Sequence, residues 1–435
     1  MKSLTVHSDG RYLMWQDGAP FFYLGDTAWE LFHRLTRGET DHYLTVRARQ
    51  GFTVIQAVAL AEHDGLRVPN AYGRLPLLDL DPTRPDLAGE YSYWDHVDWA
   101  VSRAADLGLL LALLPTWGDK YNRKWGVGPE IFTPENARAY GRWLGARYRE
   151  QWNIIWMLGG DRPLETPAHR AIIDAMAAGL RAGERADGDG GAHLITFHPM
   201  GGHSSADEVA DCDYVDLHTV QSGHGLDGYE SWRLVRRTGD AEQKPFMDAE
   251  PRYEDHPACF RPDYGYLWNA DDVRQNAYWD LFEGVCGHTY GNHSIWSFNT
   301  QPQTYWPYTW QEALLHPGAE QMRHLVTLRM SRPYFELRPV PELVLDDPAA
   351  MAHQCAARGD AYAYIYSPLG QPIRARLDAL ADRALRASWF DPRTGEEAVF
   401  AIVPPKETLF VPPTSGKGCD WVVVLDVVPE RALST

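Results

Sequence analysis

The sequence predicts an α/β protein, a (β/α)8 barrel of the TIM type followed by a smaller antiparallel β-sandwich. The chain has 435 residues, whereas a plain barrel needs about 250, so an appended domain is expected. Eight short apolar runs of strand length recur between residues 21 and 296, with helix-length segments between them. After Pro333 the pattern changes to strands separated by turn residues.

The apolar runs identify the strands of the barrel. Several runs are apolar almost throughout, as expected for parallel strands that are covered on both faces. Their alternation with helical segments favours a closed barrel over an open sheet. The expected strands are 21–25, 53–60, 109–117, 153–159, 194–198, 214–219, 245–249 and a weaker run at 288–296.

Helix signals fill the segments between these runs. Residues 93–108 place four apolar side chains on one stripe and end at Gly108, a helix stop. Thr133 offers an N-cap, and the proline after it suits a first helical turn. Residues 270–285 and 318–330 show the same periodicity.

Three regions follow from this pattern. Residues 1–20 are expected to hold a β-hairpin that packs on the barrel, with Asp17-Gly18 as its turn. Residues 21–335 form the barrel, and residues 340–430 form the sandwich. The expected sandwich strands are 361–367, 384–391, 399–403, 408–411 and 421–426.

Composition excludes several classes of partner. The net charge of −18 argues against nucleic acid and anionic membrane surfaces as partners, because both need a basic face. No signal-peptide core or apolar stretch of about 18 residues is present, so a soluble cytoplasmic protein is expected. The five scattered cysteines contain no CxxC pair, which fits a reducing compartment and gives no zinc signature. We expect no cofactor.

Two carboxylates end the fourth and seventh expected strands. Asp161 closes the run that begins at Asn153, and Glu250 closes the run that begins at Pro245. Reactive groups of a (β/α)8 barrel lie at these strand ends. Glycoside hydrolysis with retention needs two carboxyl groups about 5 Å apart, one as nucleophile and one as proton donor. The alternative is structural, since a strand-end acid often binds an arginine or caps a helix.

Other polar and aromatic residues at the strand ends are candidates for binding substrate. Asp26 ends the first strand and is expected either to bind a sugar hydroxyl or to cap the next helix. Trp29 and Trp117 offer flat faces for sugar rings, or belong to the core. Gln56 is a buried amide that needs partners and so is expected to face the pocket. Asp119 lies in the same loop as Trp117.

A second group of candidates follows the later strands. His198, His218, Gln221 and His224 are expected to hold hydroxyl groups or to orient Glu250. The remaining candidates are Arg252 in the loop after Glu250, Tyr290 as a hydrogen-bond donor to the nucleophile, and Trp296 as a pocket wall.

A metal site is the alternative for the histidines. His218 and His224 would bind one ion together with Asp216 or Asp26. Their spacing matches no ligand motif, so we expect no metal.

Seven segments, in barrel order, resemble glycoside hydrolase family 140, the apiosidase-like family. They are GDTAWELF (25–32), GFTVIQAV (51–58), WNIIWMLGGDR (152–162), TFHP (196–199), VQSGH (220–224), KPFMDAEPRYED (244–255) and GHTYGNHSIW (287–296). The tail segment SWFDPRTGE (388–396) is similar to a β-sandwich that is commonly labelled collagen-binding.

The resemblance implies a clan A barrel and a retaining mechanism, with Asp161 as acid/base and Glu250 as nucleophile. Many clan A relatives carry Asn-Glu where Gly160-Asp161 stands here. The expected function is an exo-acting glycosidase that removes a terminal furanose or pentose, such as β-apiose, from a small oligosaccharide or plant glycoside. Two alternatives remain: a metal-dependent barrel hydrolase or isomerase, and a carbohydrate-binding protein without catalysis.

Overall fold

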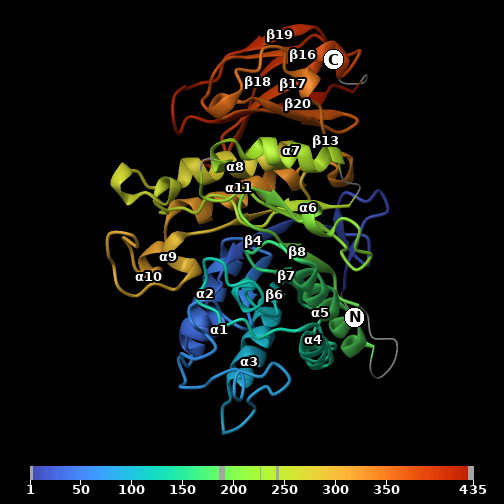
Figure 1. Ribbon diagram of the computed structural model, residues 1–435. Helices are drawn as coiled ribbons and strands as arrows, with labels where there is room; N and C mark the ends of the chain where they lie inside the picture. The colour runs from blue at the N-terminus through green and yellow to red at the C-terminus, as the bar shows by residue number, and fades with distance from the viewer. Residues whose placement is uncertain (1–2, 186–191, 226, 242–243, 430–435) are drawn as a thin grey trace.

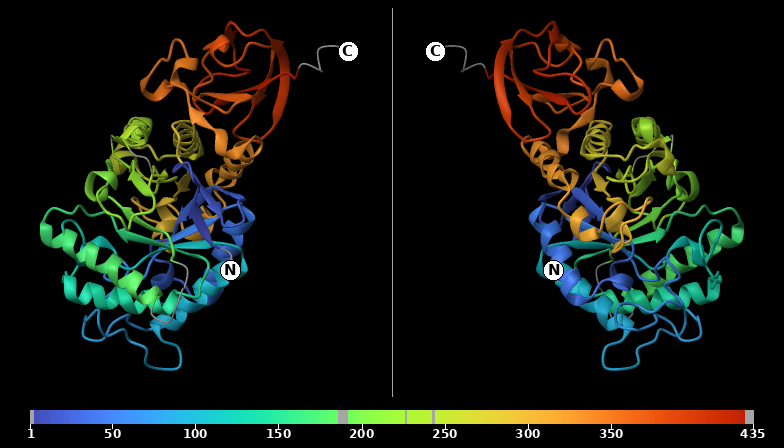
Figure 2. Two further views of the ribbon diagram at one scale, coloured as in Figure 1. Left: turned by 90° about the vertical axis from the view of Figure 1, so that its right-hand side faces the viewer. Right: turned by 90° about the vertical axis from the view of Figure 1, so that its left-hand side faces the viewer.

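The computed structural model describes residues 3–185, 192–225, 227–241 and 244–429. Residues 1, 2 and 430, which the expected domain bounds include, lie outside this part. The barrel forms the larger body, and the C-terminal sandwich stacks on the side of the barrel that carries α7 (Ser231–Ala241), α8 (Ala270–Phe282) and α11 (Pro317–Met330) (Figures 1 and 2).

Eight parallel strands build the barrel, which confirms the predicted fold class. Parallel ladders run from β8 through β7, β6, β5, β4, β12 and β11 to β10. Asp216 N donates to Ile195 O at 2.8 Å and Thr196 Oγ1 donates to Leu217 O at 2.8 Å, which joins β8 to the β10 side and closes the circle. The strands are β4 (Tyr23–Thr27), β5 (Val54–Val58), β6 (Leu110–Leu114), β7 (Ile154–Gly159), β8 (Ile195–His198), β10 (His218–Gln221), β11 (Phe246–Asp248) and β12 (Gly287–Tyr290).

The strands differ from their predicted bounds by one to six residues, and the largest differences occur in two of them. The sixth strand begins at His218 rather than at residue 214, because Asp216 turns back to accept from Ile195 N at 2.7 Å. The eighth strand ends at Tyr290, since Asn292 caps a short helix by accepting from Ser294 N at 2.8 Å. A further short strand, β9 (His203–Ser204), pairs antiparallel with β10.

The helices surround the barrel, and several of them begin at capping side chains. Thr133 accepts from Asn136 N with Pro134 in the first turn of α4, as the sequence predicts. The remaining α-helices are α1 (Leu31–Arg34), α2 (Arg37–Arg49), α3 (Tyr93–Asp106), α4 (Pro134–Tyr148), α5 (Pro167–Glu184), α6 (Ala206–Val209), α9 (His293–Trp296) and α10 (Trp310–Ala313). Short 3-10 turns are η1 (Gly118–Lys120), η2 (Asp227–Glu230), η3 (Ala258–Phe260), η4 (Pro262–Tyr264), η5 (Tyr334–Glu336), η6 (Pro341–Leu343), η7 (Ala350–Ala352) and η8 (Leu377–Ala379).

The N-terminal segment is a three-stranded sheet rather than the expected hairpin. Its strands are β1 (Leu4–Val6), β2 (Leu13–Trp15) and β3 (Pro20–Phe21), in that order. The predicted Asp17-Gly18 turn joins β2 to β3. Leu13 and Phe21 belong to the core cluster of the barrel interior, so this sheet covers the end of the barrel opposite the strand ends that carry Asp161 and Glu250.

The C-terminal domain is an antiparallel sandwich, as predicted. Its six-stranded sheet has the order β13 (Arg338–Pro339), β14 (Cys355–Arg358), β15 (Tyr362–Ser367), β20 (Trp421–Val427), β17 (Leu385–Phe390) and β18 (Glu397–Val403). A two-stranded sheet pairs β16 (Ile373–Arg376) with β19 (Glu407–Phe410). One apolar core cluster joins residues of both sheets.

The outer face of the large sheet packs on α8 of the barrel. Tyr366 stacks on Tyr278 with ring centroids 5.2 Å apart, and Tyr364 stacks on Phe282 at 5.7 Å. Beside these rings the fully buried guanidinium of Arg274 donates to both oxygens of Asp420, with Nη2 to Oδ1 at 2.5 Å and Nε to Oδ2 at 2.9 Å. Aromatic packing and the buried Arg274–Asp420 ion pair are therefore among the contacts that join the two domains.

We expect Asp420→Asn to lower the free energy of unfolding by about 3 kcal/mol, because it leaves the buried charge of Arg274 with only the partly exposed Asp271 as an acidic partner. Chemical denaturation followed by tryptophan fluorescence measures this loss. Asp346→Asn is the matched control, because it breaks an exposed pair with Arg374 within the sandwich and should change stability by less than about 1 kcal/mol. Equal losses in the two variants would contradict the assignment.

Candidate active site

A cavity of about 570 Å³ opens at the carboxyl ends of the barrel strands. Asp161 and Glu250 both line it, from the loops after β7 and β11. The rest of the lining is largely aromatic or imidazole in character: Trp29, Trp117, Trp125, His224, Tyr253, His256, Phe260, His293, Trp296 and Tyr305.

A turn with an unusual backbone presents Asp161. Three consecutive residues have positive φ: Gly159 at 85°, Gly160 at 111° and Asp161 at 56°. A Cβ atom at Gly160 would lie 2.7 Å from Gly118 N, and one at Gly159 would collide with the carbonyl oxygen of His198. Only glycine fits at these two positions, and the non-glycine Asp161 adopts a conformation that costs energy and is common at functional sites.

The carboxyl group of Asp161 receives three hydrogen bonds. Gln221 Nε2 donates to Oδ1 at 3.1 Å, while Arg162 Nη1 at 2.8 Å and Trp125 Nε1 at 3.1 Å donate to Oδ2. Burial and the neighbouring charge of Glu250 nevertheless raise its pKa above the usual value for aspartate, against the opposing effect of Arg162.

Glu250 has the opposite electrostatics. His224 Nε2 lies 3.0 Å from Oε1, and His198 Nε2 lies 3.1 Å from Oε2. Burial alone would raise the pKa of this carboxyl group, but the neighbouring His198 and His224 outweigh it and hold the pKa at about 2. Glu250 is therefore ionised at neutral pH.

His198 connects the two acids. The backbone N–H of Asp161 donates to its Nδ1 at 3.3 Å, and its Nε2 faces Glu250. Nδ1 also lies 3.0 Å from Pro199 O, and the approach of Nε2 to Glu250 Oε2 is a close polar contact rather than an aligned hydrogen bond. One imidazole ring thus spans the distance from the Asp161 backbone to the Glu250 side chain.

The aromatic side chains of the lining pack against one another around the two acids. Trp29 and Trp117 lie with ring centroids 5.1 Å apart, and Trp29 Nε1 donates to the hydroxyl of Tyr253 at 3.1 Å. Trp296 stacks on His63 at 5.2 Å. Such faces pack against the C–H faces of sugar rings.

Eight of the residues predicted for the site are brought together. Trp29, Trp117, Asp161, Gln221, His224, Glu250 and Trp296 line the cavity. His198 is fully buried and contacts Glu250.

Asp26, Gln56 and Asp119 do not line the cavity. Asp26 points outward from β4 to α2, where its Oδ2 pairs with Arg47 Nε at 2.5 Å. Gln56 lies inside the barrel, where its Nε2 donates to Ala249 O at 2.9 Å. Asp119 is buried against Lys120 Nζ at 2.6 Å.

His218, Arg252 and Tyr290 also lie outside the cavity lining. Ser205 Oγ lies 2.8 Å from His218 Nδ1, and Arg252 Nε donates to Asn276 Oδ1. The hydroxyl of Tyr290 donates to Glu254 Oε2 at 2.6 Å, so the expected bond to the nucleophile is absent. Strand alternation explains the placements of His218 and Tyr290, because residues of one parity face the helices instead of the barrel interior.

Several lining residues were not among the predicted ones. They are Glu62, Trp125, Met200, Tyr253, His256, Phe260 and Tyr305. Tyr253 is the tyrosine beside the nucleophile, and it lies three positions after Glu250 in the segment 244–255 that carries the family resemblance. The others come from long loops without a periodic signal.

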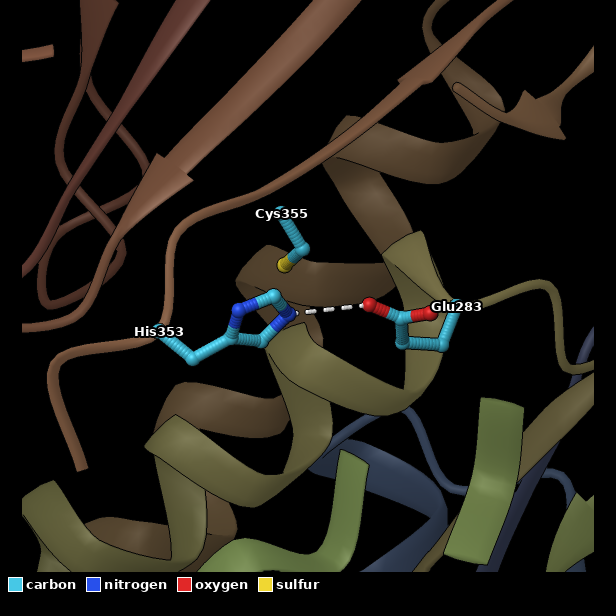
Figure 3. A group of neighbouring side chains, drawn as sticks. All are labelled: Glu283, His353 and Cys355. Carbon is cyan, nitrogen blue, oxygen red and sulfur yellow. Dashed lines mark hydrogen bonds and ion pairs between the residues drawn. The ribbon is translucent and has the colours of Figure 1, made fainter. Parts of the chain in front are cut away.

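One group of three potential metal ligands occurs among the described residues, away from this cavity. Glu283, His353 and Cys355 are buried between α8 and the sandwich, with donor atoms within 4.8 Å of one another (Figure 3). Arg236 already donates to Glu283 Oε2 at 2.8 Å and to Oε1 at 2.7 Å, and burial raises the pKa of the Cys355 thiol. His353 is also held by Asp347 Oδ2 at 2.6 Å and by Glu283 Oε1 at 3.1 Å, so a metal ion would have to displace the contacts that already occupy its ligands.

The barrel matches the sequence family described as "Apiosidase-like, catalytic domain" over residues 7–336. The chain belongs to this family. Residues 339–426 match "Putative collagen-binding domain of a collagenase". No curated protein sequence matches this apiosidase-like chain.

Solved structures resemble the whole apiosidase-like protein. A glycoside hydrolase family 5 from Bacteroides vulgatus ATCC 8482 is 30% identical with a TM-score of 0.89, covering 98% of this chain and 93% of the other. A structure named "Glycoside hydrolase" is 29% identical with a TM-score of 0.89, covering 98% and 97%. The protein is therefore a glycoside hydrolase. Within the described residues, no helix has the length and apolar character needed to cross a bilayer.

The buried Asp248 should make stability depend on pH. Its Oδ1 accepts from Glu250 N at 3.1 Å, and burial with the nearby charge of Asp280 raises its pKa to about 7. Because the folded state then binds more protons than the unfolded state, this group destabilises the fold as pH rises from about 4 to 7. We expect Asp248→Asn to remove roughly 2–4 kcal/mol of this decline.

Denaturation curves of the wild type and Asp248→Asn at pH 5 and pH 8 measure this effect. The free energy of unfolding of Asp248→Asn minus that of the wild type should be larger at pH 8 than at pH 5. A difference that does not change with pH would show that Asp248 stays in one protonation state.

Proposed function

We propose that the protein is a retaining, exo-acting glycosidase that removes a terminal furanose or pentose, in the manner of a β-apiosidase, from a small oligosaccharide or glycoside. The observation that supports this best is the opposite electrostatics of two acids in one cavity. Glu250 is held ionised by two histidines, while the pKa of Asp161 is raised. A retaining glycosidase needs this division between nucleophile and proton donor.

The reaction proceeds by double displacement. An oxygen of Glu250 forms a bond to the anomeric carbon as the glycosidic C–O bond breaks, and Asp161 transfers its proton to the departing oxygen. Asp161, now ionised, takes a proton from water, and that water attacks the anomeric carbon and releases Glu250. Gln221, Trp125 and Arg162 stabilise the ionised Asp161 between the two steps, because all three donate to its carboxylate.

The form of the site supports action on a chain end. The lining residues come from loops after several strands, including those that carry Trp125, Phe260 and Tyr305. A walled cavity receives the end of a chain, whereas an endo-acting enzyme needs a groove that runs past the acids. The family match supports a furanose or pentose as the terminal unit.

We expect Glu250→Gln and Asp161→Asn each to lower kcat by about three orders of magnitude or more on an aryl glycoside that the wild type hydrolyses. Glu165→Gln and Asp263→Asn are matched controls, because both acids are exposed and lie outside the cavity lining. Near wild-type turnover by either cavity variant would refute the assignment. Sugar binding that survives Glu250→Gln, with no turnover by the wild type, would instead indicate a binding protein.

A panel of aryl β-pentosides and β-furanosides tests the substrate class and the stereochemistry together. Proton NMR during hydrolysis should show the β-anomer of the free sugar before mutarotation, because two displacements at the anomeric carbon restore its configuration. The α-anomer as first product would mean an inverting mechanism. Preferred hydrolysis of hexopyranosides would contradict the furanose or pentose specificity.

A further inference from the structure

The cavity contains a third carboxyl group that the reaction above does not use. Glu62 follows β5, lines the cavity together with Asp161 and Trp296, and keeps 21% of its side chain exposed. The strand-end pattern gave no signal for it, because it lies in the loop four positions after the strand. Its place beside Asp161 raises the question of what it contacts during the reaction.

One oxygen of Glu62 is held by an arginine that also holds Asp161. Arg162 Nη2 donates to Glu62 Oε1 at 3.3 Å, and Arg162 Nη1 donates to Asp161 Oδ2 at 2.8 Å. The guanidinium itself is fully buried and lies 4.5 Å from the ring centre of Trp125. Arg162 therefore fixes the carboxyl group of Glu62 relative to the proposed proton donor.

The backbone around Glu62 is fixed as well. The next residue, His63, donates from its backbone N–H to Glu30 Oε1 at 3.2 Å, and its ring stacks on Trp296. Glu62 O accepts from Asp64 N at 2.5 Å. A side chain that is held at its base and at one carboxyl oxygen is preorganised for a ligand, which lowers the entropic cost of binding.

The other oxygen, Oε2, accepts no hydrogen bond from any donor within residues 3–185, 192–225, 227–241 and 244–429. A partly buried carboxyl oxygen normally has a hydrogen-bond partner. In a cavity of a glycoside hydrolase, that partner is water in the free enzyme and a sugar hydroxyl group in the complex.

We propose that Glu62 is a specificity-determining residue, whose Oε2 binds one hydroxyl group of the glycoside close to the scissile bond. This inference rests on the proposed function, since it places the hydroxyl group by its distance from Asp161. Glu62 thereby selects glycosides that carry a free hydroxyl group at that position over deoxy or substituted analogues.

The protonation state defines the kind of hydrogen bond. Burial raises the pKa of Glu62 to about 8 against the opposing effect of Arg162. Below that pH the group is a neutral acid that donates to the hydroxyl oxygen while its carbonyl oxygen accepts from Arg162. Glutamine offers the same donor and acceptor in the same shape, whereas alanine offers neither.

The test compares Glu62→Gln and Glu62→Ala on an aryl pentoside or furanoside that the wild type hydrolyses, and on its mono-deoxy analogues. Glu62→Gln should keep kcat/KM within about threefold at pH 6.5. Glu62→Ala should lose roughly 10- to 100-fold on the parent glycoside, mainly through KM, because one hydrogen bond to substrate is removed. For one deoxy analogue, Glu62→Ala and the wild type should be nearly equal.

Glu165→Ala is the control, because this exposed glutamate pairs with Lys124 outside the cavity; its kcat/KM should equal that of the wild type on every compound. If Glu62→Ala penalises every deoxy analogue as strongly as the parent glycoside, Glu62 binds no hydroxyl group and the inference fails. A thermal melt of each variant checks folding. If the alanine variant is unstable, Glu62→Met replaces it, because methionine keeps the length of the side chain but cannot form this hydrogen bond, and it should show the same loss on the parent glycoside.

The two proposals fail in different ways. If Glu250→Gln retains turnover, the proposed reaction is wrong, whatever the Glu62 variants do. If Glu250→Gln is inactive and Glu62→Ala behaves as Glu165→Ala, only the role of Glu62 is wrong. If the wild type hydrolyses none of the compounds, quenching of its tryptophan fluorescence by d-xylose and l-arabinose replaces turnover, and an unchanged Kd in Glu62→Ala overturns the inference.

Discussion

The site depends on a single buried negative charge. Glu250 lies in a largely apolar cavity, where an unpaired carboxylate would take up a proton and lose its nucleophilicity. Two histidines contact its two oxygens: His224, in the loop after β10, forms a hydrogen bond to Oε1 at 3.0 Å, and His198, at the end of β8, lies 3.1 Å from Oε2. Once that charge is fixed, it raises the pKa of Asp161 across the cavity, and the division of roles between the acids follows from it.

The strand ends of the barrel and the contacts around them determine the positions of these two acids. Two side chains bind the backbone N–H groups of the acids. Asp248 accepts from Glu250 N at 3.1 Å, and His198 accepts from Asp161 N at 3.3 Å. The Gly159-Gly160 turn then lets the shorter aspartate side chain reach the cavity from a left-handed conformation. An acid with one methylene less than glutamate is thus compensated by the path of the main chain.

The sequence alone predicted the parts of this arrangement that follow from local pattern. Apolar runs ending in Asp161 and Glu250 located the strand ends, because buried parallel strands have a simple hydrophobic signal. The same pattern could not tell which parity faces inward, so Asp26, His218 and Tyr290 were expected in a cavity that they do not line. Glu62 and Trp125 lie on loops, where position depends on distant partners such as Arg162 rather than on periodicity.

The junction of the two domains also affects how the molecule can be divided. Tyrosines of the sandwich stack on Tyr278 and Phe282 of α8, and the buried acidic partner of Arg274 belongs to that domain. A chain shortened after residue 336 would expose an aromatic surface and leave Arg274 with only the partly exposed Asp271 as an acidic partner. The sandwich therefore covers a part of the barrel surface that would otherwise be exposed to water. Engineering that aims at a minimal enzyme should shorten loops before it removes the sandwich.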